Sequence, residues 1–318
     1  RLPTRSRGLG DVYKRQPMTY PTDTVVILGL GLIGGSLARA LRETGFSKRF
    51  VGYGRRLPSL EQGVELGVID DYTLDLGEAV EQADILVIAA PTLVAEDLLA
   101  DILSRLGGRS DQPLITDVAS VKGNLQRRAV QELGRMPANL VLGHPIAGSE
   151  RSGVGASDGR LFLNHRVILT PDAGNDPEAV ATIRRMWEAT GAEVVDMAVA
   201  DHDTVLAATS HLPHVLAYAL VDALAASDAS EDIFRFAAGG FRDFTRIASS
   251  DPVMWRDITL ANREALLAAI DDFQIHLGRM RESIVSADSD ALEQTFSRAK
   301  RARDEFAALL AQRQRAGS

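Results

Sequence analysis

The chain has 318 residues, 45% of them hydrophobic and 25% charged, which is enough for two domains that each bury a core. The net charge of −8 argues against a nucleic-acid-binding surface, and an anionic substrate would need a local positive site. Cysteine is absent, which excludes disulfides, a thiolate nucleophile and cysteine-bound metals; since no apolar run approaches the roughly 20 residues of a membrane-spanning helix, we expect a cytoplasmic protein with no membrane partner.

The first residues differ in character from the rest of the chain. Residues 1–16 carry five Lys or Arg residues against one acid and show no hydrophobic periodicity. We interpret residues 1–17, which precede Met18, as a non-native or disordered leader. A transit peptide is the alternative, because such peptides are rich in Arg and poor in acidic residues.

Short, almost continuously apolar runs alternate with helix-length segments from Thr24 to about Met197. Strands buried on both faces of a parallel sheet have this pattern, and the alternation predicts a doubly wound α/β sheet. The first helix should run from Ser36 to about Thr44 and end at Gly45, which suits a left-handed cap. The runs are 25–28, 50–53, 85–89, 114–117, 140–142, 167–169 and 193–195.

After Ala198 the sequence predicts helices only. Residues 201–226 form one long apolar helical pattern, broken or kinked at Pro213. Asp251-Pro252 suits the N-cap and first position of a helix that should run to about Leu277. We therefore expect a sheet domain over residues 22–198 and an all-helical domain over residues 199–312.

The last predicted helix carries a narrow apolar stripe at spacings of three and four residues. Such a stripe packs either against the rest of the chain or against a second copy in a homodimer, and the pattern does not distinguish these. The stripe consists of Leu292, Phe296, Ala299, Ala302, Phe306 and Leu310.

A glycine-rich turn follows the first predicted strand and opens the first helix. It reads GLGLIG over residues 29–34. Gly29 permits the tight turn, Gly31 lets a pyrophosphate approach the backbone, and Gly34 lets helix and strand pack closely. The N–H groups of the helix N-terminus, including those of Leu32 and Ile33, suit phosphates. Because strand, turn and helix are in register, dinucleotide binding is favoured over a merely tight turn.

The end of the second strand bears on which dinucleotide binds. An NAD site usually has an acidic residue about 20 residues beyond the glycines, but this chain has Gly54-Arg55-Arg56. Two cations could hold a 2′-phosphate, so we favour NADP, with Arg55 ahead of Arg56. Solvated arginines beside an NAD site are the alternative.

Polar segments follow three later strands, where an open α/β sheet binds its ligands. They contain Pro91, Ser120 and His144. His144 lies between Gly143 and Pro145, just past a strand end. Because neutral imidazole can accept a hydroxyl proton near pH 7 during hydride transfer, we expect His144 to be a base rather than a structural histidine.

The helical half supplies a second polar cluster. Two histidines flank Pro213 in the segment SHLPH, residues 210–214, and the segment GGFRDFTRIA, residues 239–248, carries Arg242 and Arg246 among aromatic residues. An arginine there could bind a carboxylate through both of its N–H groups. We rank Arg246 above Arg242 as the ligand of the substrate. The alternative is a surface arginine that pairs with an acid such as Asp243.

Together these segments resemble the prephenate/arogenate dehydrogenases, the cyclohexadienyl dehydrogenases of tyrosine biosynthesis. The resemblance runs from about Val25 to Phe306 in the family's order and spacing. Its motifs are GLGLIGGS (29–36), DVASVK (117–122), GHPIAGSE (143–150), SHLPH (210–214), GGFRDFTRIA (239–248) and DPVMWRD (251–257).

The resemblance implies an N-terminal Rossmann domain, a C-terminal helical dimerisation domain, and oxidative decarboxylation of prephenate or arogenate with hydride transfer to NAD(P). His144 matches the catalytic histidine, and Ser120 matches a serine near the substrate hydroxyl and the nicotinamide. Arg246 matches the arginine that binds a substrate carboxylate. No metal is expected.

The remaining matches concern the pocket and its entrance. His214 and Trp255 match pocket residues, whereas Glu150 and Arg242 match an acid–base pair at the entrance. Two alternative functions also fit a dinucleotide-binding chain. A β-hydroxyacid-type dehydrogenase would use a lysine base in the helical half, but no lysine lies between Lys122 and Lys300. A non-catalytic dinucleotide sensor would keep the glycine turn but would have no reason to keep His144, Ser120 and Arg246 together.

Overall fold

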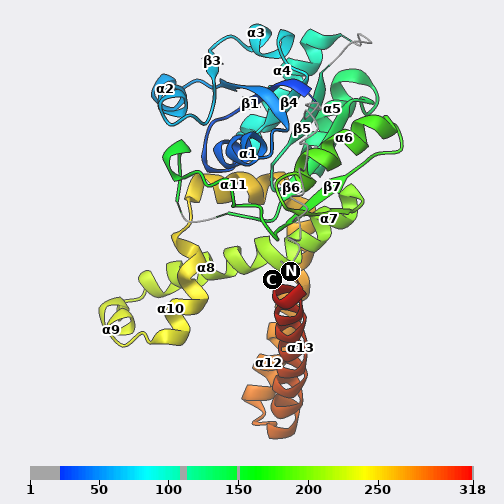
Figure 1. Cartoon of the computed structure of the whole chain (residues 1–318). Coiled ribbons are helices and arrows are strands. Elements are labelled where there is room, and N and C mark those ends of the chain that lie inside the picture. Colours follow the sequence, from blue (N-terminus) through cyan, green and yellow to red (C-terminus); the bar gives the residue numbers. More distant parts are fainter. Residues whose placement is uncertain (1–21, 108–112, 149–150, 317–318) are drawn as a thin grey trace, which may run out of the picture.

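In the computed structural model, which describes residues 22–107, 113–148 and 151–316, the strands form one sheet above a set of long helices (Figure 1). The strand order is β3-β2-β1-β4-β5-β6-β7-β8. The sheet domain and the helical part agree with the predicted fold class. The strands are β1 (Thr22–Leu28), β2 (Ser47–Tyr53), β3 (Asp71–Thr73), β4 (Ile85–Ile88), β5 (Leu114–Asp117), β6 (Leu140–Pro145), β7 (Arg166–Thr170) and β8 (Glu193–Asp196).

The first six strands are parallel and ordered as in a doubly wound dinucleotide-binding sheet, with the order reversing between β1 and β4. The prediction of parallel strands throughout is wrong for β7, which pairs antiparallel with β6, Pro145 opposite Val167. The physical reason is the connection. Between the two strands the described chain forms only the short 3-10 helix Val154–Ala156, not a crossover helix, so it returns at the same edge.

Helices cover both faces of this sheet. On β1, Val25 and Ile27 point to one side and Val26 and Leu28 to the other, and all four are fully buried. The first face carries α1 (Leu32–Glu43), α2 (Leu57–Glu65) and α6 (Pro177–Glu188), and the second carries α3 (Leu76–Glu81), α4 (Thr92–Leu106) and α5 (Gly123–Leu133).

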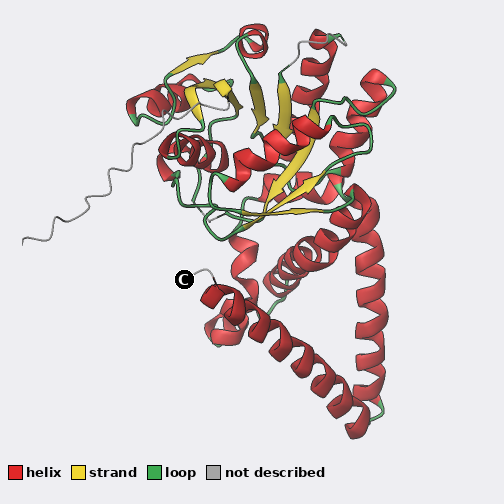
Figure 2. Ribbon diagram, turned by 45° about the vertical axis from the view of Figure 1, so that its right-hand side comes forward, coloured by secondary structure: helices red, strands yellow, loops and turns green. Residues whose placement is uncertain are grey.

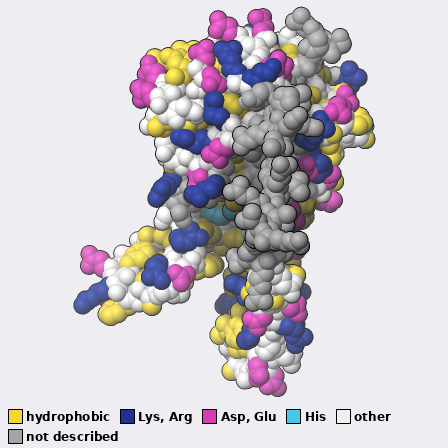
Figure 3. Space-filling model, viewed as in Figure 1, with side chains coloured by type: hydrophobic (Ala, Val, Ile, Leu, Met, Phe, Trp, Pro, Cys, Tyr) yellow, Lys and Arg dark blue, Asp and Glu magenta, His cyan; other side chains and the backbone are white. Residues whose placement is uncertain are grey.

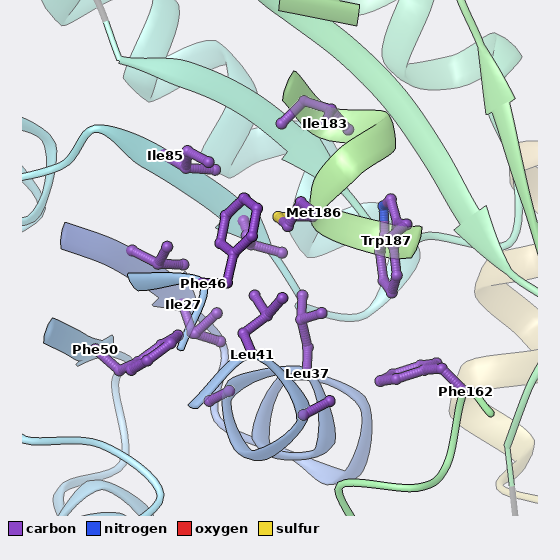
Figure 4. Close-up of a cluster of buried hydrophobic side chains, with 14 of the residues drawn as sticks. Ile27, Leu37, Leu41, Phe46, Phe50, Ile85, Phe162, Ile183, Met186 and Trp187 are labelled. Carbon is purple, nitrogen blue, oxygen red and sulfur yellow. The ribbon is translucent and has the colours of Figure 1, made fainter. Parts of the chain in front are cut away.

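The core on the first face is anchored by aromatic and long aliphatic side chains from α1 and α6 (Figure 4). Phe162 meets Trp187 edge to face, with ring centroids 5.3 Å apart. Helix α1 begins at Leu32, four residues earlier than predicted, because the glycine turn itself forms the first helical turn. It ends as expected at Gly45, where φ is +66°.

The helical half begins with one continuous span that changes its winding. Helix α7 (Val199–Leu206) runs into a π-helical segment (Ala207–His211) and then α8 (Leu212–Ala225). Pro213 lacks the N–H that would continue the α-helical ladder, so the predicted disturbance takes the form of a wider turn before the proline. His211 is therefore the last residue of the π-helical segment, and His214 lies in the first turn of α8.

By length and composition, the span Val199–Ala225, with 27 residues and a mean hydropathy of 1.3, could cross a membrane, contrary to the prediction that no apolar run is long enough. A single span of this kind is a weak sign. Its buried polar side chains, His202, Asp203 and His211, all have hydrogen-bond partners, as in a core helix of a folded domain.

The remaining helices are α9 (Ser230–Arg235), α10 (Gly239–Thr245), the 3-10 helix Arg246–Ser249, α11 (Pro252–Ala261), α12 (Arg263–Val285) and α13 (Ser289–Ala316). Asp251 caps α11 as predicted, accepting from the N–H groups of Val253 and Met254 at 2.8 and 2.9 Å. The predicted single helix to Leu277 is wrong, because the chain breaks at Asn262 and α12 continues to Val285.

Helices α12 and α13 form a hairpin that projects from the rest of the molecule (Figure 2). The predicted stripe of α13 lies in solvent within a single chain, since Phe296 and Phe306 are 56% and 53% exposed. Of the two possibilities left open by the sequence, these side chains favour an intermolecular interface over packing within the chain.

Candidate active site

The glycine turn has the geometry expected for a dinucleotide site. Gly29 has φ +108°, and a Cβ built there would lie 2.5 Å from the carbonyl oxygen of Ala89 at the end of β4. A Cβ at Gly34 would lie 2.4 Å from the Gly29 carbonyl oxygen. At Gly31, by contrast, no heavy atom of the described chain comes within 4 Å. Gly29 and Gly34 are thus needed for packing, whereas Gly31 leaves open space.

That open space suits a pyrophosphate. Gly31 is the N-cap of α1, so the N–H groups of Leu32, Ile33 and Gly34 have no acceptor within the helix. The first turn carries no acidic residue to repel an anion. The residues present therefore fit the phosphates of a dinucleotide cofactor.

The other predicted cofactor residues lie at the neighbouring strand ends. Gly29 N–H donates to the Tyr53 carbonyl oxygen at 2.9 Å, which joins the turn to the end of β2. Arg55 and Arg56 follow that end and are exposed. Pro91 is the N-cap of α4, just after β4. All of these groups lie along the carboxyl edge of β2, β1 and β4.

A buried ion pair ties β5 to β6. Lys122 is fully buried, and its Nζ donates to Asp117 Oδ2 and, at 2.7 Å, to the carbonyl oxygen of Gly143. Asp117 Oδ1 in turn accepts from Gly143 N–H at 3.1 Å. Burial lowers the pKa of Lys122, with Asp117 opposing that shift. This pair holds the backbone just before His144, and neither residue was singled out in the sequence.

His144 lies within β6, which extends to Pro145 because it pairs with β7, and not just past a strand end as predicted; it is buried, with 8% of its surface exposed. Its Nδ1 lies 2.9 Å from Nε2 of His202 on α7. Burial first, and then the charges of His202, Lys122 and His211, hold the pKa of His144 well below its usual value. The imidazole is therefore neutral near pH 7, as a proton acceptor must be.

His202 contacts a carboxylate that the sequence analysis also did not single out. His202 Nδ1 donates to Asp203 Oδ1 at 2.8 Å, and Asp203 also accepts from the backbone N–H groups of Lys122 at 3.0 Å and Gly123 at 2.8 Å. Burial raises the pKa of Asp203, but the hydrogen bonds from His202 and these N–H groups bring it below its usual value. The adjacent His and Asp at the start of an apolar helix were the available sequence signal.

Aromatic rings continue this cluster across the helical half. His214 stacks on Trp255 with ring centroids 3.5 Å apart, and His211 meets the same indole edge to face at 6.2 Å. Asn262, at the break between α11 and α12, donates to the Asp203 carbonyl oxygen at 2.8 Å and lies 3.1 Å from Nδ1 of His211. The structure thus brings the predicted pocket residues His214 and Trp255 together.

Arg246 begins the 3-10 helix after α10 and is exposed. Its charge contributes to lowering the pKa of His214, after burial, so the two side chains are close. His211 is electrostatically coupled to His202 and to His214. Electrostatic interactions therefore link His144, the histidines His202, His211 and His214, and Arg246 across the junction of the two halves.

The remaining predicted site residues are placed differently. Ser120 is half-buried on the loop between β5 and α5, next to the strand that carries His144. Arg242 is exposed and its Nε donates to Asp243 at 3.1 Å, the surface pair weighed as its alternative. Glu150 lies outside the described residues. In the part of the chain that is described, no group of three or more His, Asp or Glu side chains is placed to hold a metal.

The surface agrees with this arrangement. Figure 3 shows histidine surface in the hollow where the sheet domain meets the helical arms, with Lys and Arg side chains around it and apolar surface below. Such a combination suits a small anionic molecule with an apolar ring.

Comparison with known proteins agrees with the site. The chain matches the family model of the prephenate dehydrogenase nucleotide-binding domain over residues 37–196 and that of the prephenate dehydrogenase dimerization domain over residues 198–298. It is 38% identical to the prephenate dehydrogenase of Bacillus subtilis over 90% of this chain and 77% of that protein. With the cyclohexadienyl dehydrogenase of Zymomonas mobilis it shares 36% identity over 88% of this chain and 94% of that protein.

Solved structures show the same relationship. The prephenate dehydrogenase of Aquifex aeolicus, in complex with hydroxyphenyl propionate and NAD+, has a TM-score of 0.82 and 38% identity, covering 89% of this chain and 98% of that one. The Synechocystis arogenate dehydrogenase has a TM-score of 0.75 and 30% identity, covering 89% and 99%. The fold, the site and these matches together show that the chain belongs to the prephenate dehydrogenase family, whose members oxidise prephenate or arogenate.

Proposed function

We propose that this chain oxidatively decarboxylates prephenate or arogenate with His144 as the proton acceptor. The observation that carries the proposal is the neutral, buried imidazole at the end of β6, held on the carboxyl edge of the sheet that also presents the glycine turn. A base at that edge is positioned for a substrate lying beside a nicotinamide.

In this proposal a bound nicotinamide would accept hydride from the ring carbon that carries the hydroxyl group. His144 takes the hydroxyl proton, and Ser120 lies near the same oxygen. The ketone that forms is linked through the ring double bonds to the saturated ring carbon that bears the carboxylate. The carboxylate leaves as carbon dioxide, and the electron pair of the broken C–C bond passes through the ring to the ketone oxygen, which makes the ring an aromatic phenolate. His144 then returns the proton to the phenolate oxygen, so the residue ends as it began.

Arg246 would hold a substrate carboxylate, and the stacked pair His214 and Trp255 would form the apolar wall beside the ring. The low pKa of His214 keeps that wall uncharged near pH 7, so it does not compete with the guanidinium for the anion. We also propose that Arg242 and Glu150 act as an acid–base pair at the entrance of the pocket.

We also propose that NADP is accepted, with Arg55 contacting the 2′-phosphate and Arg56 beside it. Support comes from two exposed arginines, and no acid, directly after β2. The related Aquifex aeolicus structure contains NAD+, so both carriers belong in any test.

We further propose a cytoplasmic homodimer with its domains divided at residues 198 and 199. The sheet ends with β8 at Asp196 and α7 begins at Val199, which supports the division 22–198 and 199–312. The exposed apolar side chains of α12 and α13 support an interface with a second copy.

The function is tested by assaying the purified protein with prephenate and with arogenate, each with NAD and with NADP. Reduced nicotinamide and carbon dioxide should appear in equal amounts with at least one pair. Carrier reduction without carbon dioxide release would contradict the reaction, and a strong preference for NAD would contradict the role of Arg55.

A further inference from the structure

Three side chains from two halves of the chain form one line of hydrogen bonds. Asp203 Oδ1 lies 2.8 Å from His202 Nδ1, and His202 Nε2 lies 2.9 Å from His144 Nδ1. His202 is fully buried and Asp203 nearly so. The two histidines are 58 positions apart in the sequence.

The hydrogen bonds of this line favour one arrangement of its protons. The two oxygens of Asp203 already accept from the backbone N–H groups of Lys122 and Gly123, so Asp203 is an acceptor. His202 Nδ1 must then carry the hydrogen. A neutral His202 has its lone pair on Nε2, and the partner facing that lone pair, His144 Nδ1, must donate.

That leaves the lone pair of His144 on Nε2, the ring nitrogen remote from His202. We propose that His202 and Asp203 are positioning residues which hold His144 in the Nδ1–H tautomer and stabilise the imidazolium it becomes. The inference rests on the proposed role of His144 as proton acceptor. When Nε2 takes the substrate's hydroxyl proton, the imidazolium keeps its Nδ1–H bond to His202, and the negative charge of Asp203 behind His202 stabilises it electrostatically.

The other groups around His144 do not supply this function. Lys122 lies close by but is bonded to Asp117, and its positive charge disfavours an imidazolium. His211 lies on the π-helical segment and disfavours it also. Among the residues that the structure describes, Asp203 is thus the carboxylate that hydrogen bonds connect to His144, through one imidazole.

The line also connects the two halves of the molecule. His144 belongs to β6, whereas His202 and Asp203 belong to α7, and Asp203 binds the N-terminus of α5 in the sheet domain. The protonation pattern of the base is therefore set by the docking of α7 against the sheet.

Histidine tautomers give the first test, and they need no substrate. The chain has six histidines, so 15N-histidine-labelled protein gives a small spectrum that single Asn variants can assign. At pH 7, His144 and His202 should both be protonated at Nδ1 and unprotonated at Nε2. A His144 protonated at Nε2 would overturn the proposal, whatever the enzyme's substrate proves to be.

Turnover gives the second test. In Asp203→Asn, the amide NH2 takes either the Oδ1 position, where it meets both His202 and the Lys122 N–H, or the Oδ2 position, where it meets the Gly123 N–H, and in both cases the buried negative charge is lost. Facing His202, it reverses both tautomers and puts a hydrogen on His144 Nε2. We expect kcat to fall by roughly 10²- to 10⁴-fold, the range for lost base catalysis and a wrong tautomer, with the KM for the dinucleotide unchanged. Asp201→Asn, at an exposed position on the same helix, is the matched control.

Two substitutions of His202 separate positioning from packing. His202→Asn keeps a donor toward Asp203 but removes the acceptor for His144, whereas His202→Gln places an amide oxygen where Nε2 lay. Gln should retain at least about tenfold more kcat than Asn, and His165→Gln, at an exposed position of the sheet domain, should match the unmodified protein. Equal losses in both His202 variants would mean that His202 only fills space, and the proposal would fail.

If the tautomers are as stated but no substrate pair is turned over, the positioning inference stands and the proposed function fails. If turnover is normal in Asp203→Asn, the function stands and the positioning inference fails.

Discussion

Lys122 donates to the carboxylate of Asp117 and to the carbonyl oxygen of Gly143, the residue before His144, although all of its side chain is buried. A lysine without solvent contact is costly unless it is paired. Here the pair joins the neighbouring strands β5 and β6 directly before the residue that carries the base, His144. The stability of the sheet edge and the position of the base thus depend on one buried contact.

Replacing Lys122 by Met should therefore destabilise the protein by about 3–5 kcal/mol, because it leaves Asp117 charged and buried without its partner. Urea unfolding followed by circular dichroism measures the change. The double variant with Asp117→Asn should recover part of the loss. A change in the single variant below about 0.5 kcal/mol, the range of ordinary surface substitutions, would contradict this account.

Two glycines of the first turn should respond in opposite ways to the same change. Gly34→Ala should destabilise the fold by about 1–3 kcal/mol, since its Cβ would lie 2.4 Å from a carbonyl oxygen. Gly31→Ala should leave the melting temperature unchanged and weaken dinucleotide binding at least tenfold, or about 1.4 kcal/mol, because its Cβ enters the open space. Calorimetric titration with NAD and NADP measures the binding, and unaltered affinity in Gly31→Ala would remove the turn from the cofactor site.

His144→Asn should leave dinucleotide binding intact while kcat falls by at least ~100-fold, the scale of lost acid–base catalysis. His165→Asn, at an exposed histidine of the sheet domain, is the control for handling and folding. Near-normal turnover would exclude His144 from the mechanism.

Arg246→Gln should raise the KM for the substrate about 100-fold, because a charge-assisted hydrogen bond to a carboxylate contributes about 1.5–3 kcal/mol. Arg242→Gln should have the smaller effect, since Arg242 is exposed and pairs with its neighbour Asp243. Steady-state kinetics compare the KM values of the two variants. Arg263→Gln, at an exposed arginine at the start of α12, is the reference. A larger rise in KM for Arg242→Gln than for Arg246→Gln would assign the carboxylate contact to Arg242.

The pH dependence of stability should reflect His211, whose pKa burial lowers to about 4. Between that value and the ordinary pKa of 6.5 the unfolded chain binds the proton more readily, so the contribution is complete above pH 6.5 and is lost as the pH falls toward 4. The melting temperature of His211→Asn should vary less over this window than that of the unmodified chain. The exposed His165→Asn serves as the comparison, and identical pH profiles for all three proteins would contradict the assignment.

The sequence by itself predicted the features that neighbouring residues determine. Strand β1 is apolar at every position from Val25 to Leu28 because both of its faces are buried, and the GLGLIG turn needs glycine for reasons of local geometry. Asp251 and Pro252 likewise predict the start of a helix from local sequence alone. These patterns were enough to expect the fold class and His144.

Only the tertiary structure decided the contacts between distant residues. Asp203 binds the backbone of Lys122, 81 positions away, and nothing in either segment specifies that pairing. The antiparallel β7 depends on how the chain returns after β6, and the break at Asn262 depends on partners in α7 and the π-helical segment. Local sequence encodes burial and capping, whereas the line from Asp203 to His144 exists because packing α7 on the sheet brings two separate halves within hydrogen-bonding distance.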